Sequence, residues 1–214
     1  MSLLCYLKRL FAPFARGRQP TLPNSSACST PKSTAAPKPS AKTPSAGPST
    51  RPKSPKRYAE TRAKTPNVSA KPIVPRAIVL HHSGGSYAGG VSWIKNPASR
   101  VSYHVLVAPD GRRTVFAEPT QRTWHAGRSE WRGKRDLNSW SVGASFSGDT
   151  NREPLTHDAM ASMADYLMPL LDKYNLAQGD ITDHRTVSPG RKDDLKPSEL
   201  ARFKGYLADR LSHT

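Results

Sequence analysis

The first third of the chain is poorly suited to forming a hydrophobic core, and this confines any folded domain to the remainder. From about Arg18 to Lys71 the sequence consists mainly of Ser, Thr, Pro, Ala and Lys. Proline removes a backbone donor and fixes φ, and too few large apolar side chains are present to offset the entropy of ordering the segment. We therefore predict a disordered basic tail, rich in Pro, Ser and Lys, over residues 1–72. The folded domain is expected over residues 73–214.

The positive charge is concentrated in the same segment. Residues 1–75 hold 14 of the 33 Lys and Arg and a single acid, Glu60, whereas residues 76–214 hold 19 bases and 15 acids. The net charge of +17 therefore describes the tail more than the domain, which argues against a specific nucleic-acid-binding fold. Such a tail attracts polyanions without selecting among them. We expect an anionic envelope surface as its partner, with DNA binding by the tail alone as the rival interpretation.

The cysteines and the N-terminus give only weak information about the cellular compartment of the protein. Cys5 and Cys28 both lie in the tail, so the domain has no disulfide and no thiolate metal ligand. No stretch approaches the roughly 20 apolar residues that span a bilayer. Lys8 and Arg9 interrupt the apolar N-terminus, which fits a cleavable signal peptide poorly. We expect synthesis in the cytoplasm without a clear signal peptide, and the N-terminus is read as a disordered end or as a short amphipathic helix on an anionic membrane.

Residues 73–214 alternate between strand and helix patterns. Apolar runs and alternation predict strands, an Asp110-Gly111 turn predicts a hairpin, and apolar residues at three- and four-residue steps after Thr156 predict a capped helix. The mixture predicts an α/β domain with a central mixed β-sheet flanked by helices. The expected elements are strands at 77–82, 139–148 and 181–184, a hairpin over 102–118, a helical turn at 93–98, and helices after Thr156 and at 197–211.

Histidines at strand ends are candidates for a metal site. His81 and His82 follow a buried apolar run, and a rigid strand is a good support for ligands. Neighbouring residues of a strand point to opposite faces, so only one of the two can face a shared site. His157 lies at a helix start and His213 near the C-terminus, and both are expected to face solvent.

The segment DHRTVSPGRKDD, residues 183–194, is the strongest candidate for chemistry. A rigid Ser-Pro-Gly turn can bring an acid back toward His184, and Lys192 and Asp194 share a side of an extended chain. Two neutral imidazoles and one carboxylate leave the fourth position of a tetrahedral zinc open, as catalytic zinc requires. A charge-rich surface loop is the alternative interpretation of the same residues.

Five segments, in order, resemble the zinc-dependent N-acetylmuramoyl-L-alanine amidases of phage lysins, bacterial cell-wall recycling enzymes and peptidoglycan-recognition proteins. These segments are IVLHHS, VSYHVLVAPDG, TWHAG, NSWSVGASFSG and HRTVSPGRKDD. The resemblance covers roughly residues 75–212. It implies one zinc amidase domain that acts on peptidoglycan, and we expect a monomer.

The resemblance implies roles for individual residues. His81, His184 and Asp194 match the three zinc ligands, whereas Asp193 falls at a variable position of the family. The role implied for the catalytic residues Tyr103 and Lys192 is oxyanion stabilisation. His125, near the expected zinc, and Trp124 are weaker candidates for contact with substrate, and buried packing is the alternative for the tryptophan.

The chain departs from the family pattern at two positions. Ser145 stands where the recycling branch has a glutamate base, and Leu195 stands where the family usually has proline after the third ligand. Because a serine hydroxyl is no general base at neutral pH, the first departure favours a mechanism that relies on Tyr103 and Lys192.

The resemblance implies hydrolysis of the amide between N-acetylmuramic acid and L-alanine, in a phage or prophage endolysin acting on the cell wall from the periplasm or the exterior. Two alternatives remain open. One is a bacterial enzyme of wall remodelling or interbacterial attack, and the other is a metal-free peptidoglycan-binding module of the same fold.

Overall fold

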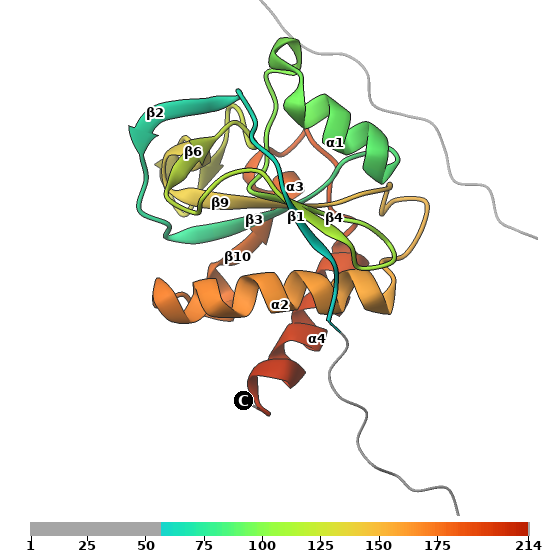
Figure 1. The fold of residues 1–214 in the computed structure, drawn as a ribbon. Coiled ribbons are helices and arrows are strands. Elements are labelled where there is room, and N and C mark those ends of the chain that lie inside the picture. The colour runs from blue at the N-terminus through green and yellow to red at the C-terminus, as the bar shows by residue number, and fades with distance from the viewer. Residues whose placement is uncertain (1–56, 214) are drawn as a thin grey trace, which may run out of the picture. The chain divides into compact units, whose positions relative to one another are not determined.

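The computed structural model describes residues 57–213, which form a central mixed sheet with helices on both faces (Figure 1). Six strands make up this sheet, and four more strands form two small two-stranded sheets. The strands of the central sheet are β1 (Glu60–Arg62), β3 (Ala77–His82), β4 (Val105–Val107), β5 (Arg113–Val115), β9 (Ser141–Phe146) and β10 (Ile181–Asp183). The small sheets pair β2 (Val68–Pro72) with β6 (Gln121–Thr123), and β7 (Glu130–Trp131) with β8 (Lys134–Arg135). The helices are α1 (Tyr87–Lys95), α2 (His157–Lys173), α3 (His184–Val187) and α4 (Pro197–Leu211).

The strand order is β1-β5-β4-β9-β3-β10, with β4, β9, β3 and β10 parallel to one another. The hairpin strand β5 is antiparallel to β4, and β1 runs parallel to β5. The expected α/β fold with a mixed sheet is therefore confirmed. Because the carboxyl ends of the parallel strands meet at one edge, the side chains that end β3 and follow β10 are brought together.

The main core lies between the sheet and α2 with α4, below the sheet in Figure 1. Leu80 of β3 and Phe146 of β9 point into it, and Phe146 contacts the ring of Phe203 on α4. Successive strand residues point to opposite faces, so His81 and Ser145 lie on the other face, beneath α1 and the connecting loops. This alternation gives one face of the sheet to the main core, whereas the other face carries the polar site together with two smaller hydrophobic clusters.

Several expected elements are confirmed. The Asp110-Gly111 turn joins β4 and β5, the strand within 139–148 is β9, and α4 spans 197–211 as expected. Gly111 has φ +84°, and a Cβ there would lie 2.2 Å from the ring of Tyr58, so both the turn and the close approach need glycine. Thr156 caps α2 by accepting the amide hydrogen of Ala159.

Two helices differ from expectation. α1 begins at Tyr87 rather than near Trp93, since the Ser86 side chain caps it and Tyr87, Val91 and Ile94 pack together around Leu106 at helical spacing. His184 was expected to end a strand, but it opens the short helix α3, capped by Asp183. None of the helices in the described part of the chain is long and apolar enough to cross a membrane.

Strand structure also begins earlier than expected. We expected the tail to continue to residue 72, but β1 and β2 both precede Ile73. Their three-residue and five-residue runs carry little apolar character, and long-range pairing with β5 and β6 stabilises them. The part of the tail prediction that concerns residues 1–56 lies outside the described residues and stays a prediction.

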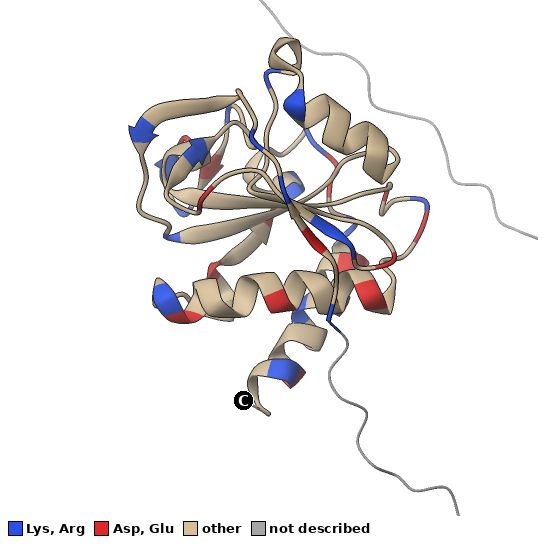
Figure 2. Cartoon of the chain, in the orientation of Figure 1, with Lys and Arg blue, Asp and Glu red and all other residues tan. Residues whose placement is uncertain are grey.

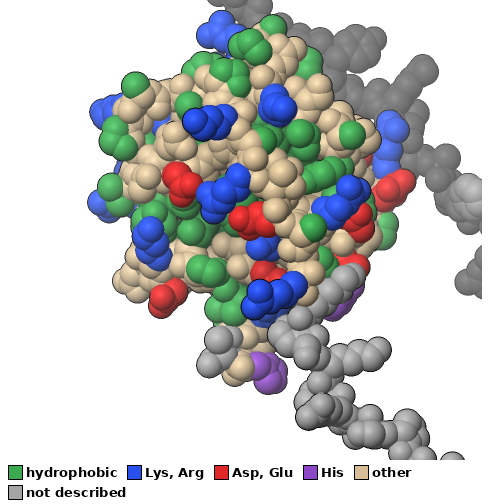
Figure 3. Space-filling view, in the orientation of Figure 1, with side chains coloured by type: hydrophobic (Ala, Val, Ile, Leu, Met, Phe, Trp, Pro, Cys, Tyr) green, Lys and Arg blue, Asp and Glu red, His purple; other side chains and the backbone are tan. Residues whose placement is uncertain are grey.

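Charges on the domain are mixed in sign. Figure 2 shows acidic and basic residues interspersed along the helices and loops, and Figure 3 shows both signs on the face in view. All 16 acids of the chain lie at Glu60 or later, so bases in the domain have acidic neighbours, as in the pair of Arg113 and Glu60 at 2.8 Å.

Asn67 ties the segment before β2 to the loop that follows α1. Its side chain is buried, and its amide nitrogen lies 2.9 Å from Asn96 O, 3.1 Å from Val101 O and 3.2 Å from Ile94 O. The Thr65 hydroxyl donates to the same Ile94 carbonyl at 2.7 Å. These bonds pair the buried Asn67 amide with three backbone carbonyls and tie the two segments together.

We expect Asn67→Ala to lower the free energy of unfolding by about 1–3 kcal/mol, because the hydrogen bonds that link the segment before β2 to the end of α1 and the loop after it are lost. Urea denaturation followed by circular dichroism measures the change. Lys64→Ala, at an exposed position three residues earlier, is the control and should be near neutral. Equal stability of both variants would show that this segment does not anchor the loop after α1.

Candidate metal centre

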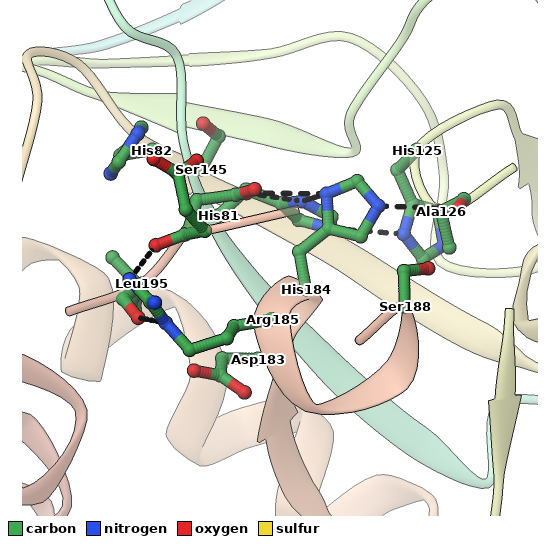
Figure 4. A network of polar contacts seen from close by, with 12 residues as sticks. His81, His82, His125, Ala126, Ser145, Asp183, His184, Arg185, Ser188 and Leu195 are labelled. Atoms are coloured by element: carbon green, nitrogen blue, oxygen red, sulfur yellow. Dashed lines mark hydrogen bonds and ion pairs between the residues drawn. The ribbon is translucent and has the colours of Figure 1, made fainter. Parts of the chain in front are cut away.

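Three buried side chains converge at the carboxyl edge of the sheet: His81 at the end of β3, His184 directly after β10, and Asp194 on the following loop. The Nδ1 atoms of the two histidines are 3.0 Å apart, and each lies 3.2 Å from Asp194 Oδ2. Figure 4 shows the rings of His81 and His184 turned toward one another. The expected trio is thus brought together by elements far apart in the sequence.

The other ring nitrogen of each histidine is committed to a hydrogen bond. His184 Nε2–H donates to Ala126 O at 3.2 Å. His81 Nε2 lies 3.1 Å from His125 Nδ1, His125 Nε2 lies 3.4 Å from Ser141 Oγ, and Ser141 Oγ–H donates to Leu137 O at 2.7 Å. Because a carbonyl oxygen only accepts, the Ser141 hydroxyl donates to Leu137 O and accepts from His125 Nε2–H. His125 Nδ1 then has no proton and accepts from His81 Nε2–H.

These assignments leave Nδ1 of both histidines without a proton. Two imidazole lone pairs and a carboxylate oxygen then point at one another with no hydrogen between them, which is unfavourable unless a cation lies among them. Two nitrogens and one oxygen match the donor preference of zinc, and three protein ligands leave one position open. The residues present therefore fit a catalytic zinc ion.

Burial and mutual interaction keep His81 and Asp194 in the ionisation states that a metal needs. Burial, together with the neighbouring His184, lowers the pKa of His81 to about 4. Burial alone would raise the pKa of the Asp194 carboxyl, but its contacts with His184 and His81 hold it well below its usual range. Neutral imidazole and ionised carboxylate are the ligand forms, so at neutral pH few protons need to leave when a metal binds.

Gly143 makes room for the hydrogen-bonded histidine chain. A Cβ at this position of β9 would lie 2.3 Å from His125 Cγ, so the imidazole lies directly on the strand backbone. Asn138 holds the same loop from the other side, because its Oδ1 accepts from the amides of His125 and Ala126 at 3.1 and 2.8 Å. The glycine of the Ser-Val-Gly segment is therefore explained by a close approach.

Arg185 fixes the loop that carries Asp194. Its backbone amide donates to Asp194 O at 2.5 Å, and its Nε donates to Leu195 O at 2.9 Å (Figure 4). Its guanidinium also contacts Asp193 O and Asn151. Arg185, next to the candidate ligand His184, thus holds the backbone around the candidate ligand Asp194 in place. Asp193 is exposed, and its carboxylate accepts from Asn151 Nδ2 at 3.2 Å rather than joining the trio.

A cleft of about 530 Å³ opens over the trio. Tyr103 and Lys192 line it together with His184 and Asp194, so the two residues expected to stabilise an oxyanion face the same space as the candidate ligands. The Tyr103 ring centroid lies 4.9 Å from that of His81. Burial and the charge of Asp194 raise the pKa of Tyr103, which keeps its hydroxyl protonated and able to donate.

Ser145 lies beside His81 in the paired register of β9 and β3, and it is fully buried. Its hydroxyl donates to Phe146 O at 3.3 Å. The position that the resemblance matches to a glutamate base is thus on the site's face of the sheet, but here it holds a group that cannot take a proton at neutral pH.

The two residues expected to contact substrate occupy other surroundings. His125 is buried behind His81, and Trp124 donates its indole N–H to Ser69 Oγ at 2.9 Å. Neither is among the residues that line the cleft. Substrate contact by these two residues stays a prediction, whereas His125 contacts a candidate ligand directly.

Sequence reasoning missed the supporting residues Asn138, Ser141 and Arg185, and it also missed His104. Burial lowers the pKa of His104 to about 4, Gly143 N donates to its Nδ1 at 3.0 Å, and its Nε2–H donates to Gln121 O at 2.9 Å. His104 is therefore a neutral structural histidine under the site. Its burial just before β4 could not be inferred from the spacing of the histidines.

Comparison with known proteins identifies the family. Residues 70–197 match the family described as N-acetylmuramoyl-L-alanine amidase. The chain belongs to this family. The enzyme called 1,6-anhydro-N-acetylmuramyl-L-alanine amidase AmpD, of Citrobacter freundii, is 32% identical over 109 residues, which cover 50% of this chain and 58% of that protein. The chain thus spans little more than half the length of that curated relative.

Solved structures of the amidase family share the fold. A crystal structure of an AmpD derivative has a TM-score of 0.61 at 23% identity and covers 69% of this chain and 93% of the AmpD chain. A mutant endolysin from Bacillus subtilis has a TM-score of 0.58 at 18% identity, with coverage of 71% and 99%. At these identities the likeness concerns the fold, and the site is argued from this chain's own residues.

His184→Ala or Asp194→Ala should remove most of the bound zinc, because two ligands remain and one buried group is left unpaired. Metal content after dialysis against a weak chelator, measured by mass spectrometry, tests this. Asp193→Ala is the matched control, one residue away and exposed, and should retain zinc. Zinc loss in Asp193→Ala with retention in Asp194→Ala would overturn the ligand assignment.

The free energy of unfolding of the metal-free protein should fall as pH decreases from about 6.5 to about 4. The pKa values of His81 and His104 are about 4, and that of His125 is lowered well below its usual value, all three mainly through burial. In this window the unfolded chain binds protons that the folded chain does not, so stability is fully present above the unfolded pKa near 6.5 and is lost below it. Urea titrations at pH 7.5 and pH 5 with a chelator present measure the difference; equal midpoints would contradict the burial of neutral histidines.

Proposed function

We propose that this chain is a zinc-dependent N-acetylmuramoyl-L-alanine amidase that cleaves the amide between N-acetylmuramic acid and L-alanine in peptidoglycan. The observation that carries the proposal is the buried trio of His81, His184 and Asp194 beneath a cleft lined by Tyr103 and Lys192. Family membership supports the reaction class. A complex of the Escherichia coli amidase AmiD, described as holding anhydro-N-acetylmuramic acid-L-Ala-D-gamma-Glu-L-Lys, covers 66% of this chain and 59% of that chain at 21% identity, with a TM-score of 0.52.

Each part of the site has a task in this reaction. Zinc, when bound by the trio, supplies polarisation of the scissile carbonyl and acidification of a water molecule. The His125–Ser141 chain and Ala126 O keep the two imidazoles in the ligand tautomer. Tyr103 and Lys192 donate hydrogen bonds to the carbonyl oxygen as negative charge develops on it. Because Ser145 is no base, these two donors carry more of the stabilisation than they would beside a glutamate.

Digestion of purified sacculi tests the reaction directly. Mass spectrometry should find intact glycan chains and freed stem peptides that begin with L-alanine. A zinc-loaded protein that binds sacculi and releases no peptide would instead support the alternative of a peptidoglycan-binding module.

We keep a phage or prophage endolysin as the proposed context, with an enzyme of wall remodelling or attack as the alternative; both act on the wall from the periplasm or the exterior. Relative rates on intact sacculi and on soluble 1,6-anhydro muropeptides test this. Faster turnover of the soluble compounds would favour a recycling enzyme and overturn both contexts.

Lys192→Ala and Tyr103→Phe should each lower turnover roughly 100- to 1000-fold, since each removes a donor to the developing oxyanion. Zinc content and the melting temperature should stay at the parent values, because neither residue belongs to the trio. Steady-state assays on muropeptide at full zinc occupancy measure the effect. Turnover close to the parent rate in both variants would show that Tyr103 packs in the sheet and Lys192 is a solvated loop charge.

The segment before residue 57 is proposed to attract the enzyme to anionic envelopes, because it carries ten bases and no acid. Deletion of residues 1–56 should reduce activity on whole envelopes at low salt and leave turnover of a small soluble muropeptide unchanged. The deficit should shrink as salt rises, since salt screens the attraction. Equal activity of both forms on envelopes at low salt would remove this role.

A further inference from the structure

One wall of the cleft carries an aromatic side chain that the site chemistry does not use. Trp93, on α1, is 56% exposed, the most exposed aromatic side chain among the described large hydrophobic residues. It lines the same cleft as Tyr103, His184 and Lys192. The other three tryptophans are at least partly buried, and Trp131 is stacked on Trp140 with ring centroids 6.4 Å apart. An indole left open to solvent at a binding cleft is available for a ligand.

The helix that carries Trp93 keeps the surface beside it bare. Gly89 and Gly90 lie four and three positions earlier, one turn away, and both line the cleft. Helical side chains lean toward the N-terminus, so the indole extends over this turn. Glycine inside a helix costs about 1 kcal/mol relative to alanine. Both glycines also have a packing reason, because a Cβ at Gly90 would lie 2.8 Å from Leu106 Cδ2 and a Cβ at Gly89 would lie 3.1 Å from Ser86 Oγ. The turn beside the indole therefore carries no side chain that could cover the ring.

Charge divides the cleft into two parts. The charged side chains that line it, Lys192, Asp193 and Asp194, all belong to the loop after α3. The wall formed by α1 and the loop before it contributes serine, glycine and apolar residues together with Trp93. A ligand with one charged end and one neutral ring would place the neutral ring at the α1 wall.

The substrate of the proposed function has this form. On one side of the scissile amide lies a stem peptide with carboxylates, and on the other lies a muramic acid whose carboxyl is consumed in the amide. Its pyranose ring is neutral and presents an apolar face of C–H groups. We propose that the Trp93 indole stacks on this pyranose ring and thereby selects substrates that carry the sugar; the inference rests on the proposed function.

The test compares two substrates with the same peptide and the same scissile amide. One is N-acetylmuramyl-peptide, and the other carries a D-lactyl group in place of the whole sugar. For Trp93→Ala, kcat/KM on the muramyl compound should fall about tenfold, through KM with kcat nearly unchanged, as expected for one lost stacking contact. The same variant should act on the lactyl compound at the parent kcat/KM. Trp93→Tyr should keep most of the preference.

Val74→Ala is the matched control, because Val74 is 66% exposed and lies outside the cleft. It should leave both substrates unchanged. Equal loss on both substrates in Trp93→Ala, or no loss on either, would overturn the stacking role while the amidase function stands.

A parent protein that cleaves neither compound would instead reject the proposed function. Calorimetry with the two compounds then decides the sugar site separately. A parent that binds the muramyl compound more tightly, by a margin that Trp93→Ala removes, supports stacking, and equal affinities overturn it.

Discussion

The site depends on a pair of hydrogen bonds that remove one ring nitrogen of each ligand histidine from the metal position. His184 gives its Nε2–H to Ala126 O, and His81 gives its own to His125. Without these bonds either imidazole could present a proton to the other, and the 3.0 Å approach of the two Nδ1 atoms would become an ordinary hydrogen bond. Neighbouring residues hold both hydrogen bonds in place and so keep the two Nδ1 atoms free of protons. Gly143 admits His125, Ser141 and Leu137 orient it, and Asn138 and Arg191 hold the loop that supplies Ala126 O.

The elements that position the ligands could be predicted from local sequence, because their signals are local. The apolar run of 77–82 indicates a buried strand, the Asp110-Gly111 pair indicates a hairpin, and apolar periodicity indicates α2 and α4. The candidate ligands were found because histidines at strand ends and an acid after a tight turn can be recognised by type and spacing. The resemblance to known amidases then selected Asp194 over Asp193, and the structure buries the former and exposes the latter.

The parts that sequence did not predict owe their structure to distant partners. β1 has three exposed residues and forms only because β5 offers an unpaired edge, while Tyr58 lies against the turn at Gly111. The start of α1 was missed since its glycines indicate a loop, although Ser86 caps it and Ile94 is buried beneath it. Ser141 and Arg185 look like ordinary polar residues. Their roles arise from contacts that link residues far from them in sequence or fix the backbone of a separate loop, and no local pattern encodes such contacts.

One side of the site is built from buried strands, and the other side is open to solvent. Two of the three ligands, His81 and His184, lie at the ends of β3 and β10, strands that are almost wholly buried, so the sheet fixes most of the metal position. The opposite wall is a nine-residue helix with two internal glycines, one buried residue and an exposed indole. Chemistry that needs fixed geometry is thus supported by the core, while the wall proposed to meet the sugar is a short helix that carries an exposed indole. Such a division lets the α1 wall change its ligand preference without disturbing the histidine chain behind the metal position.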